Sequence, residues 1–129
     1  MNDKTKTIWL TVGAIGLAAV FLMFGAGKFI DPAKWIDKFA AWGLPEWFVS
    51  VSGALELAGA IGLMIPVLRG PAGLSLALFM IGAVGTHIVH AEIVMIFVAS
   101  AILVGSAIVG WLRLPETMNF LSGYNVAHE

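Results

Sequence analysis

The chain has 129 residues, of which 60% are hydrophobic and only 12% are charged. Soluble domains carry about 25% charged residues, so this composition, with a mean hydropathy of +0.95, excludes an ordinary soluble globular domain. The formal net charge of −1 argues against a nucleic-acid partner, and the absence of cysteine excludes thiolate metal sites and iron–sulfur ligation by this chain.

Four apolar runs follow one another along the chain, at about residues 8–27, 46–66, 71–90 and 93–112. At about 1.5 Å per residue, each is long enough to cross a hydrocarbon core about 30 Å thick. The first run exceeds the usual signal-peptide core of about 7–15 residues, so we expect it to be retained as a span. Because the loops are short, sequential helices should be antiparallel neighbours. The predicted fold is all-α: an integral membrane four-helix bundle that forms a single transmembrane domain, residues 1–129.

The distribution of Lys and Arg beside the spans predicts the orientation. With four spans, both termini share one side of the membrane with the loop between the second and third spans. That side carries Lys4, Lys6, Arg69 and Arg113, whereas the other carries Lys34 and Lys38, plus Lys28 if it lies outside the core. Since positive charge favours the cytoplasmic side, we expect both termini to be cytoplasmic.

The segment between the first two spans has the pattern of a short amphipathic helix, at about residues 32–42. Asp31 can cap its start and Gly43 can end it. Its apolar side chains share one face and its charges take the other, so we expect an interfacial helix in the headgroup layer. Trp42 and the nearby Trp47 either anchor this layer or form an aromatic wall for a flat ligand such as a quinone.

Small residues recur at four-residue spacing in the second and fourth spans. The main examples are Ala54, Ala58, Gly62, Ala101 and Gly105. In a membrane, such ridges let helix backbones approach closely. The ridges therefore mark seams inside the bundle or contacts between subunits, and the pattern does not separate the two.

Glu56 lies in the middle of the second span, with no other charge between the ends of that span. A charge near the bilayer centre costs about 3 kcal/mol, so this carboxyl must be neutral, face a wet cavity or be paired. Lys28, at the end of the first span, is the candidate partner. The two lie about 15 Å apart in depth, which long side chains and a moderate tilt can cover. Otherwise Lys28 reaches outward to the headgroups and Glu56 stays neutral.

His87 and His90 stand three residues apart near the end of the third span, so they should share one helix face. Both lie toward the same membrane face as Lys28. One interpretation is a pair of hydrogen-bonded interfacial histidines without a ligand. Another is a buried polar pocket, shared with Lys28 and Glu56, that binds a quinone headgroup or relays protons.

A metal or haem site is the third interpretation of the two histidines. They cannot be trans axial ligands of one haem. Together with Glu46 or Glu92 they could hold a metal ion, but the sequence gives only a weak signal for such a site. We therefore predict no metal site and assign no catalytic residue. His128, in the polar tail after Pro115, is expected to be solvated.

Three stretches, Phe24–Phe29, Trp42–Trp47 and Gly53–Gly59, followed by Pro66, resemble the DoxX-like family of small four-span bacterial membrane proteins. The resemblance covers about residues 10–112 and singles out Lys28, Glu56, Pro66 and His87. It implies a multi-pass protein of the bacterial cytoplasmic (inner) membrane. The family is named after membrane subunits of a thiosulfate:quinone oxidoreductase, and some members associate with redox partners. Related four-span proteins in animals act as assembly chaperones for membrane receptors.

Two functional hypotheses follow from the residues and this resemblance. In the first, the protein is an accessory membrane subunit of a quinone-linked redox system, with Lys28, Glu56 and His87 around the headgroup and Trp42 or Trp47 stacked on it. A partner then supplies the redox centre, so we expect no independent catalytic activity and no covalently bound cofactor. In the second, the protein is a non-catalytic assembly factor or scaffold. Beside the lipid membrane, the expected partners are a second copy or a redox or other membrane protein.

Overall fold

The computed structural model describes residues 1–127, and the burial of side chains through residue 123, so the predicted solvated His128 lies outside the described residues. Every element within this part is helical: α1 (Asp3–Ile30), α2 (Pro32–Ala41), α3 (Trp47–Met64), the 3-10 turn η1 (Pro66–Leu68), α4 (Arg69–Val89) and α5 (Ile93–Ala127). The helices α1, α3, α4 with η1, and α5 are long and apolar enough to cross a membrane. The predicted all-α bundle of four spans, with a short helix between the first two, is confirmed.

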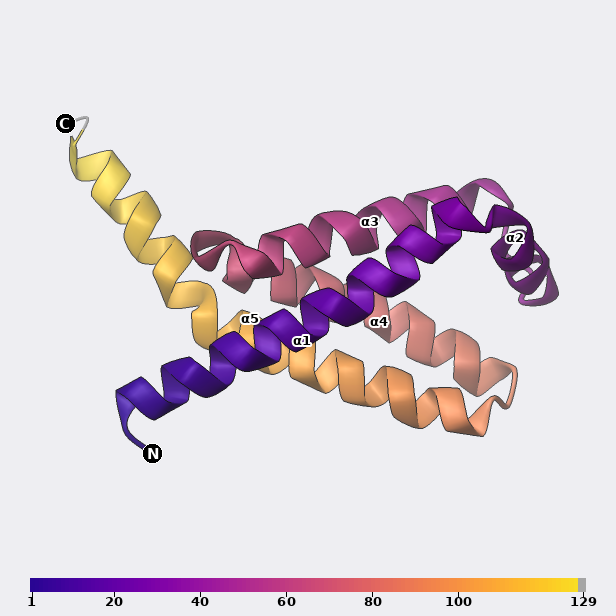
Figure 1. The fold of residues 1–129 in the computed structure, drawn as a ribbon, viewed down its shortest axis with the longest axis horizontal. Helices are drawn as coiled ribbons and strands as arrows, with labels where there is room; N and C mark the ends of the chain where they lie inside the picture. Colours follow the sequence, from indigo (N-terminus) through magenta and orange to yellow (C-terminus); the bar gives the residue numbers. More distant parts are fainter. Residues whose placement is uncertain (128–129) are drawn as a thin grey trace.

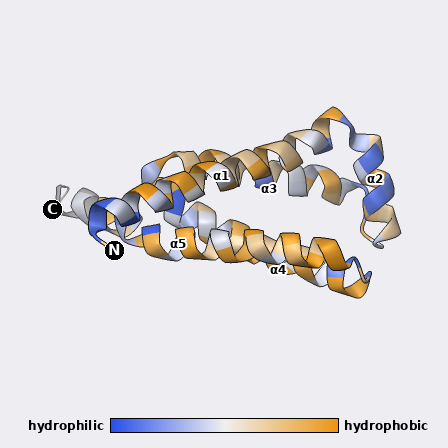
Figure 2. Ribbon diagram, turned by 60° about the horizontal axis from the view of Figure 1, so that its bottom comes forward, coloured by the Kyte–Doolittle hydropathy of each residue, from blue (hydrophilic) through white to orange (hydrophobic). Residues whose placement is uncertain are grey.

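The four long helices form two antiparallel pairs, α1 with α3 and α4 with α5 (Figure 1). One end of the bundle holds the N-terminus, η1 and the C-terminal part of α5. The other end holds α2 and the α4–α5 turn. Figure 2 shows that the pairs lie close together at the terminal end and diverge toward α2. This divergence decides where a cavity can form.

The apolar core lies between the two helix pairs, from the middle of the bundle toward the end that carries the N-terminus. Its buried members are Ala14, Ala18, Phe21, Ala60, Leu63, Leu76, Met80, Ala99 and Val109. Large apolar side chains also cover the outside, where Leu78 and Phe97 are more than two-thirds exposed. An outer surface of this kind is expected to face lipid, because only an apolar surface is stable against hydrocarbon.

Glycines bring the helices of each pair into backbone contact. A Cβ atom added at Gly73 of α4 would lie 2.7 Å from the Cα of Gly110 of α5. One added at Gly25 of α1 would lie 3.0 Å from the carbonyl oxygen of Gly53 of α3. Real Cβ atoms essentially never lie 2.7 Å from another heavy atom, and at 3.0 Å the backbone neighbour would have to shift, so glycine favours the close approach at both helix crossings.

The small residues singled out in the sequence divide between the inside and the outside of the bundle. Gly62 packs against Ala72 inside the bundle, and Gly105 contacts Leu17. The other three face outward, namely Ala54, Ala58 and Ala101. These three alanines therefore do not pack between helices of this chain.

The short helix α2 has the ends that its sequence predicts. The Asp31 side chain accepts a hydrogen bond from the backbone N–H of Lys34 at 3.5 Å, and Pro32 occupies the first helical position. Gly43 has a φ of 77°, the left-handed conformation that commonly follows a helix.

The helix α5 extends further than the predicted fourth span. The sequence placed the end of that span at Leu112 and a polar tail after Pro115, whereas α5 continues through Pro115 to its end. Proline removes one backbone hydrogen bond and crowds the preceding turn, so it bends this helix instead of ending it. The yellow C-terminal part of α5 leaves the bundle at the bend (Figure 1). Beside the bend, Arg113 donates to Glu116 at 2.9 Å and to Thr11 of α1 at 3.3 Å.

Candidate functional site

Lys28 of α1 and Glu56 of α3 form a buried ion pair. The Lys28 Nζ atom lies 2.7 Å from Glu56 Oε1, and each side chain is only 5% exposed. In a helix the Cα–Cβ bond tilts toward the N-terminus, so in these antiparallel helices the two side chains lean toward each other. Gly53 permits the approach, because a Cβ there would lie 3.2 Å from the Cβ of Lys28. The lean of both side chains closes the gap in depth that the sequence left between them.

Aromatic rings surround the Lys28 ammonium group on its remaining sides. Its Nζ atom lies 4.2 Å from the ring centroid of Trp35 and 6.0 Å from those of Phe24 and Phe39. These distances suit cation–π attraction, which offsets part of the cost of burying the charge. The rings also block the route by which Lys28 would otherwise reach the headgroup layer.

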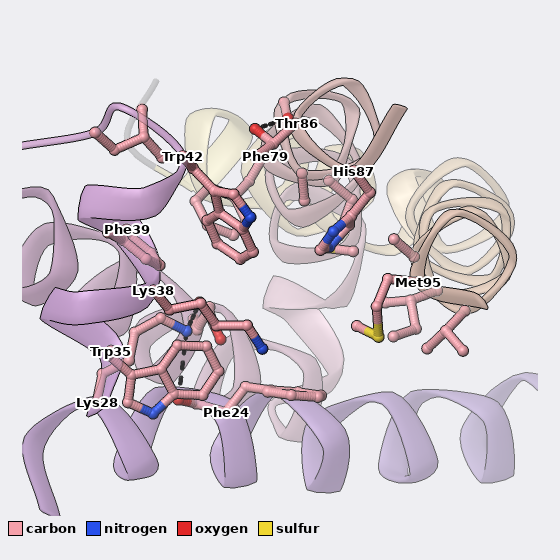
Figure 3. A pocket seen from close by; sticks show the side chains of 18 of the residues that line it. Phe24, Lys28, Trp35, Lys38, Phe39, Trp42, Phe79, Thr86, His87 and Met95 are labelled. Atoms are coloured by element: carbon pink, nitrogen blue, oxygen red, sulfur yellow. Dashed lines mark hydrogen bonds and ion pairs between the residues drawn. The ribbon is translucent and has the colours of Figure 1, made fainter. Parts of the chain in front are cut away.

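A cavity of about 340 Å³ adjoins this ion pair. It lies in the diverging part of the bundle, and all five α-helices contribute to its walls. Seven of the lining side chains are phenylalanine or tryptophan: Phe21, Phe24, Trp35, Phe39, Trp42, Phe48 and Phe79. Figure 3 shows Lys28 and His87 entering from opposite sides of this space. Cavities that bind small molecules usually measure about 300–1,000 Å³ and combine apolar walls with a few polar groups, as this one does.

His87 of α4 supplies the polar group on the second wall. It is 7% exposed, and its Nδ1 atom lies 2.5 Å from Oε2 of Glu92, in the α4–α5 turn. Trp42, which follows α2, donates from Nε1 to the other oxygen of Glu92 at 3.2 Å. The Trp42 and His87 rings meet edge to face, with centroids 5.4 Å apart. Through its hydrogen bond with Trp42, Glu92 links the end of α2 to the α4–α5 turn beside the cavity.

The carboxyl group of Glu92 lies between the spans and has a pKa below its ordinary range. The hydrogen bond from His87 is the largest cause, followed by the one from Trp42, and both favour the charged form. Because the folded-state pKa is depressed, this group stabilises the fold above the pKa that it has in the unfolded chain. That stabilisation is lost as the pH falls through the folded-state pKa.

Acid is therefore expected to remove the stabilising effect of Glu92. Near neutral pH, Glu92→Gln should lower the melting temperature, because the amide is uncharged and binds His87 and Trp42 less strongly. The difference from the unsubstituted protein should shrink once the pH drops below the ordinary range of a glutamate, as thermal melts across pH would show. Glu46→Gln, at an exposed carboxylate near the start of α3, serves as the matched control. A Glu92 effect that stays constant into acid would contradict this assignment.

Two residues predicted for the site lie elsewhere. His90 is exposed, and its Nδ1 atom is 2.8 Å from the carbonyl oxygen of Thr86. It follows the last residue of α4, where the chain turns through Ala91 at a φ of 55°, so the face predicted to be shared with His87 is lost. Trp47 is 65% exposed and lies outside the cavity, which its neighbour Phe48 lines instead.

Most of the aromatic lining was not predicted. The apolar side chains of residues 32–42 were expected to share one face, with Trp42 either in the headgroup layer or in an aromatic wall for a flat ligand. In the structure Trp35, Phe39 and Trp42 of this face line the cavity. The spacing of these residues identified the face without its direction. Phe79 and Met95 carried no signal, since apolar residues fill both sides of a membrane helix.

The arrangement of two histidines and a carboxylate considered for a metal is not assembled. Within residues 1–127, no three side chains of His, Asp or Glu gather as metal ligands would. His87 binds Glu92, whereas His90 turns to its own helix, and Glu46 is exposed.

A family model described as the DoxX-like family matches residues 12–109. The chain belongs to the DoxX-like family. The resemblance found in the sequence is thereby confirmed, and this DoxX-like protein is an integral membrane protein with four candidate spans. The match includes Lys28, Glu56 and His87. No curated protein and no solved structure matches this chain.

Proposed function

We propose that this DoxX-like protein is an accessory membrane subunit of a quinone-linked redox system and that its cavity binds the quinone ring. The observation that carries the proposal is the aromatic cavity of about 340 Å³ with polar groups on opposite walls. A quinone ring is flat and apolar, with one oxygen at each end. The lining offers aromatic faces to the ring, and Lys28 with Glu56 on one wall and His87 on the other face its oxygens.

The proposed location of the protein is the bacterial inner membrane. The chain crosses the bacterial inner membrane four times with both termini in the cytoplasm, so the cavity lies near the opposite face. A partner protein supplies the redox centre, and this chain supplies the quinone site. Its outer apolar surface also allows a homo-oligomer within the same assembly.

Filling the cavity is expected to abolish quinone binding. Ala83 lines the cavity from α4, and phenylalanine in its place adds a ring inside the space without removing a polar group. We expect Ala83→Phe to weaken binding of a short-chain ubiquinone analogue at least tenfold, measured by isothermal titration calorimetry in detergent. Ala54→Phe adds the same ring on the exposed face of α3 and should leave binding unchanged. Equal affinity in both variants would exclude the cavity as the quinone site.

A second candidate function is that of a non-catalytic assembly factor for another membrane protein. The outward-facing Ala54 and Ala58 favour it, because small residues on a lipid-facing helix allow close approach of a second helix. The same two variants separate the functions. In an assembly factor, Ala54→Phe reduces the amount of co-purified partner, whereas Ala83→Phe leaves it unchanged.

A further inference from the structure

We infer that the cavity selects the reduced form of the ring, a hydroquinone, which donates a phenolic hydrogen bond to Nε2 of His87. The inference rests on the proposed function, since it assumes that the cavity accepts a quinone ring. It adds the chemical form of the ligand and the role of each polar atom.

The contacts of Glu92 fix the tautomer of His87. Glu92 is ionised near neutral pH, because its hydrogen bonds with His87 and Trp42 lower its pKa. An ionised carboxylate only accepts hydrogen bonds, so the His87 Nδ1 atom, 2.5 Å from Oε2, must carry the proton and donate. In the neutral ring, Nε2 then holds the lone pair and is an acceptor.

The Nε2 atom of His87 is open to the cavity. Among the described residues, no group forms a hydrogen bond with Nε2. The atom is also not one of the fully buried nitrogen and oxygen atoms that lack a hydrogen-bond partner in that part of the chain. The residue as a whole is 7% exposed and lines the cavity, into which Figure 3 shows its ring directed. The neighbouring Thr86 hydroxyl donates to the carbonyl oxygen of Gly82 at 2.9 Å and does not bind the ring.

On the opposite wall the donors of Lys28 are already engaged. The Lys28 ammonium group donates to Glu56 Oε1 at 2.7 Å and to the Phe24 carbonyl oxygen at 3.5 Å, and it faces the Trp35 ring. The second oxygen of Glu56 has no hydrogen bond within the described residues and is an acceptor. Lys38 also lines the cavity, with an exposed side chain whose Nζ atom lies 5.4 Å from the centroid of the Trp35 ring (Figure 3). Its ammonium group can donate to a carbonyl oxygen or to a hydroxyl oxygen alike, so it does not set the preference between the two forms of the ring.

The two buried walls therefore offer acceptors, which need donors from the ligand. A quinone has two carbonyl oxygens and no donor, so these acceptors would lose water without gaining a hydrogen bond. A hydroquinone has two O–H groups and satisfies them. The reduced ring should bind more tightly than the oxidised one.

Three small ligands that share a tetramethyl-substituted ring test this preference: tetramethylhydroquinone, its dimethyl ether and tetramethyl-1,4-benzoquinone. The quinone matches the hydroquinone in size, whereas the ether adds one methyl group at each oxygen. The ether keeps the ring and removes both donors. Under anaerobic titration calorimetry at neutral pH, with empty micelles subtracted, the hydroquinone should bind at least roughly tenfold more tightly than the other two, since tenfold is the size expected for a single hydrogen bond to a buried acceptor. Equal binding of all three would overturn the inference and leave the proposed quinone site intact. Binding of none would overturn both.

A pair of histidine variants locates the acceptor. His87→Phe keeps an aromatic ring beside Trp42 and removes the nitrogen, so the preference for the hydroquinone over its ether should fall to what the Glu56 acceptor alone provides, while the affinity for the ether stays within twofold. His90→Phe, at the exposed histidine outside the cavity, should retain the full preference. A preference that is undiminished in His87→Phe would refute the assignment to this residue. The ligand series on the unsubstituted protein decides the question even if His87→Phe does not fold.

Discussion

Glu56→Leu is expected to lower the free energy of unfolding by about 3–5 kcal/mol, the usual cost of leaving one charge of a buried pair without its partner. Lys28 would remain buried, with 5% of its side chain exposed, and the rings of Trp35, Phe24 and Phe39 would block its way to the headgroups. Reversible unfolding in mixed detergent micelles, followed by far-UV circular dichroism, measures the change.

The double variant Lys28→Met/Glu56→Leu provides the decisive control. Both charges are then gone, and side chains of similar volume replace them, so most of the lost stability should return. Lys34→Met removes an exposed lysine from α2 and should change the stability by less than about 0.5 kcal/mol. A double variant no more stable than Glu56→Leu alone would show that the two side chains contribute independently.

The fold could be predicted from the sequence because the membrane leaves few alternatives. Hydrocarbon about 30 Å thick requires about 20 apolar residues for each helix, and the four runs meet this length. The residues Asp31, Pro32 and Gly43 also marked the ends of α2. The end of α5 was not predicted, because Pro115 bends a helix or ends it depending on the contacts around it, here those of Arg113.

A contact of the site could be predicted from the sequence only where burying one residue without a partner would cost free energy. A carboxyl group in the middle of an apolar span needs a partner, and Lys28 was the cation within reach of Glu56. His90 was placed by its spacing from His87, and Trp47 by its nearness to Trp42 in the sequence. Both lie at helix ends, where the chain leaves the regular helix and position in the sequence no longer sets the direction of a side chain. A polar pocket was one interpretation of these residues, but its position and aromatic walls could not be predicted, since the cavity lies where the two helix pairs diverge.

Within one of these pairs, α4 and α5 are in backbone contact at Gly73, so Gly73→Ala should have a large effect for so small a change. A methyl group at this position would lie 2.7 Å from the Gly110 Cα and nitrogen atoms and 2.8 Å from the Ser106 carbonyl oxygen. All three are backbone atoms of α5, which cannot turn aside as a flexible side chain can. The two helices must separate along their whole contact, and we expect a loss of about 3 kcal/mol, the upper end of the usual cost of overpacking.

Gly85→Ala is the matched control, since Gly85 lies on the same helix with nothing within 4 Å of an added Cβ. Alanine favours a helix over glycine by about 1 kcal/mol, so this variant should be unchanged or more stable. The two substitutions add the same methyl group to α4 and differ only in what it meets, so thermal melts should move in opposite directions. Equal shifts would mean that helix propensity, rather than the backbone contact with α5, governs the stability of α4. A fall confined to Gly73→Ala would attribute it to the glycine contact that holds α4 against α5 beneath the cavity.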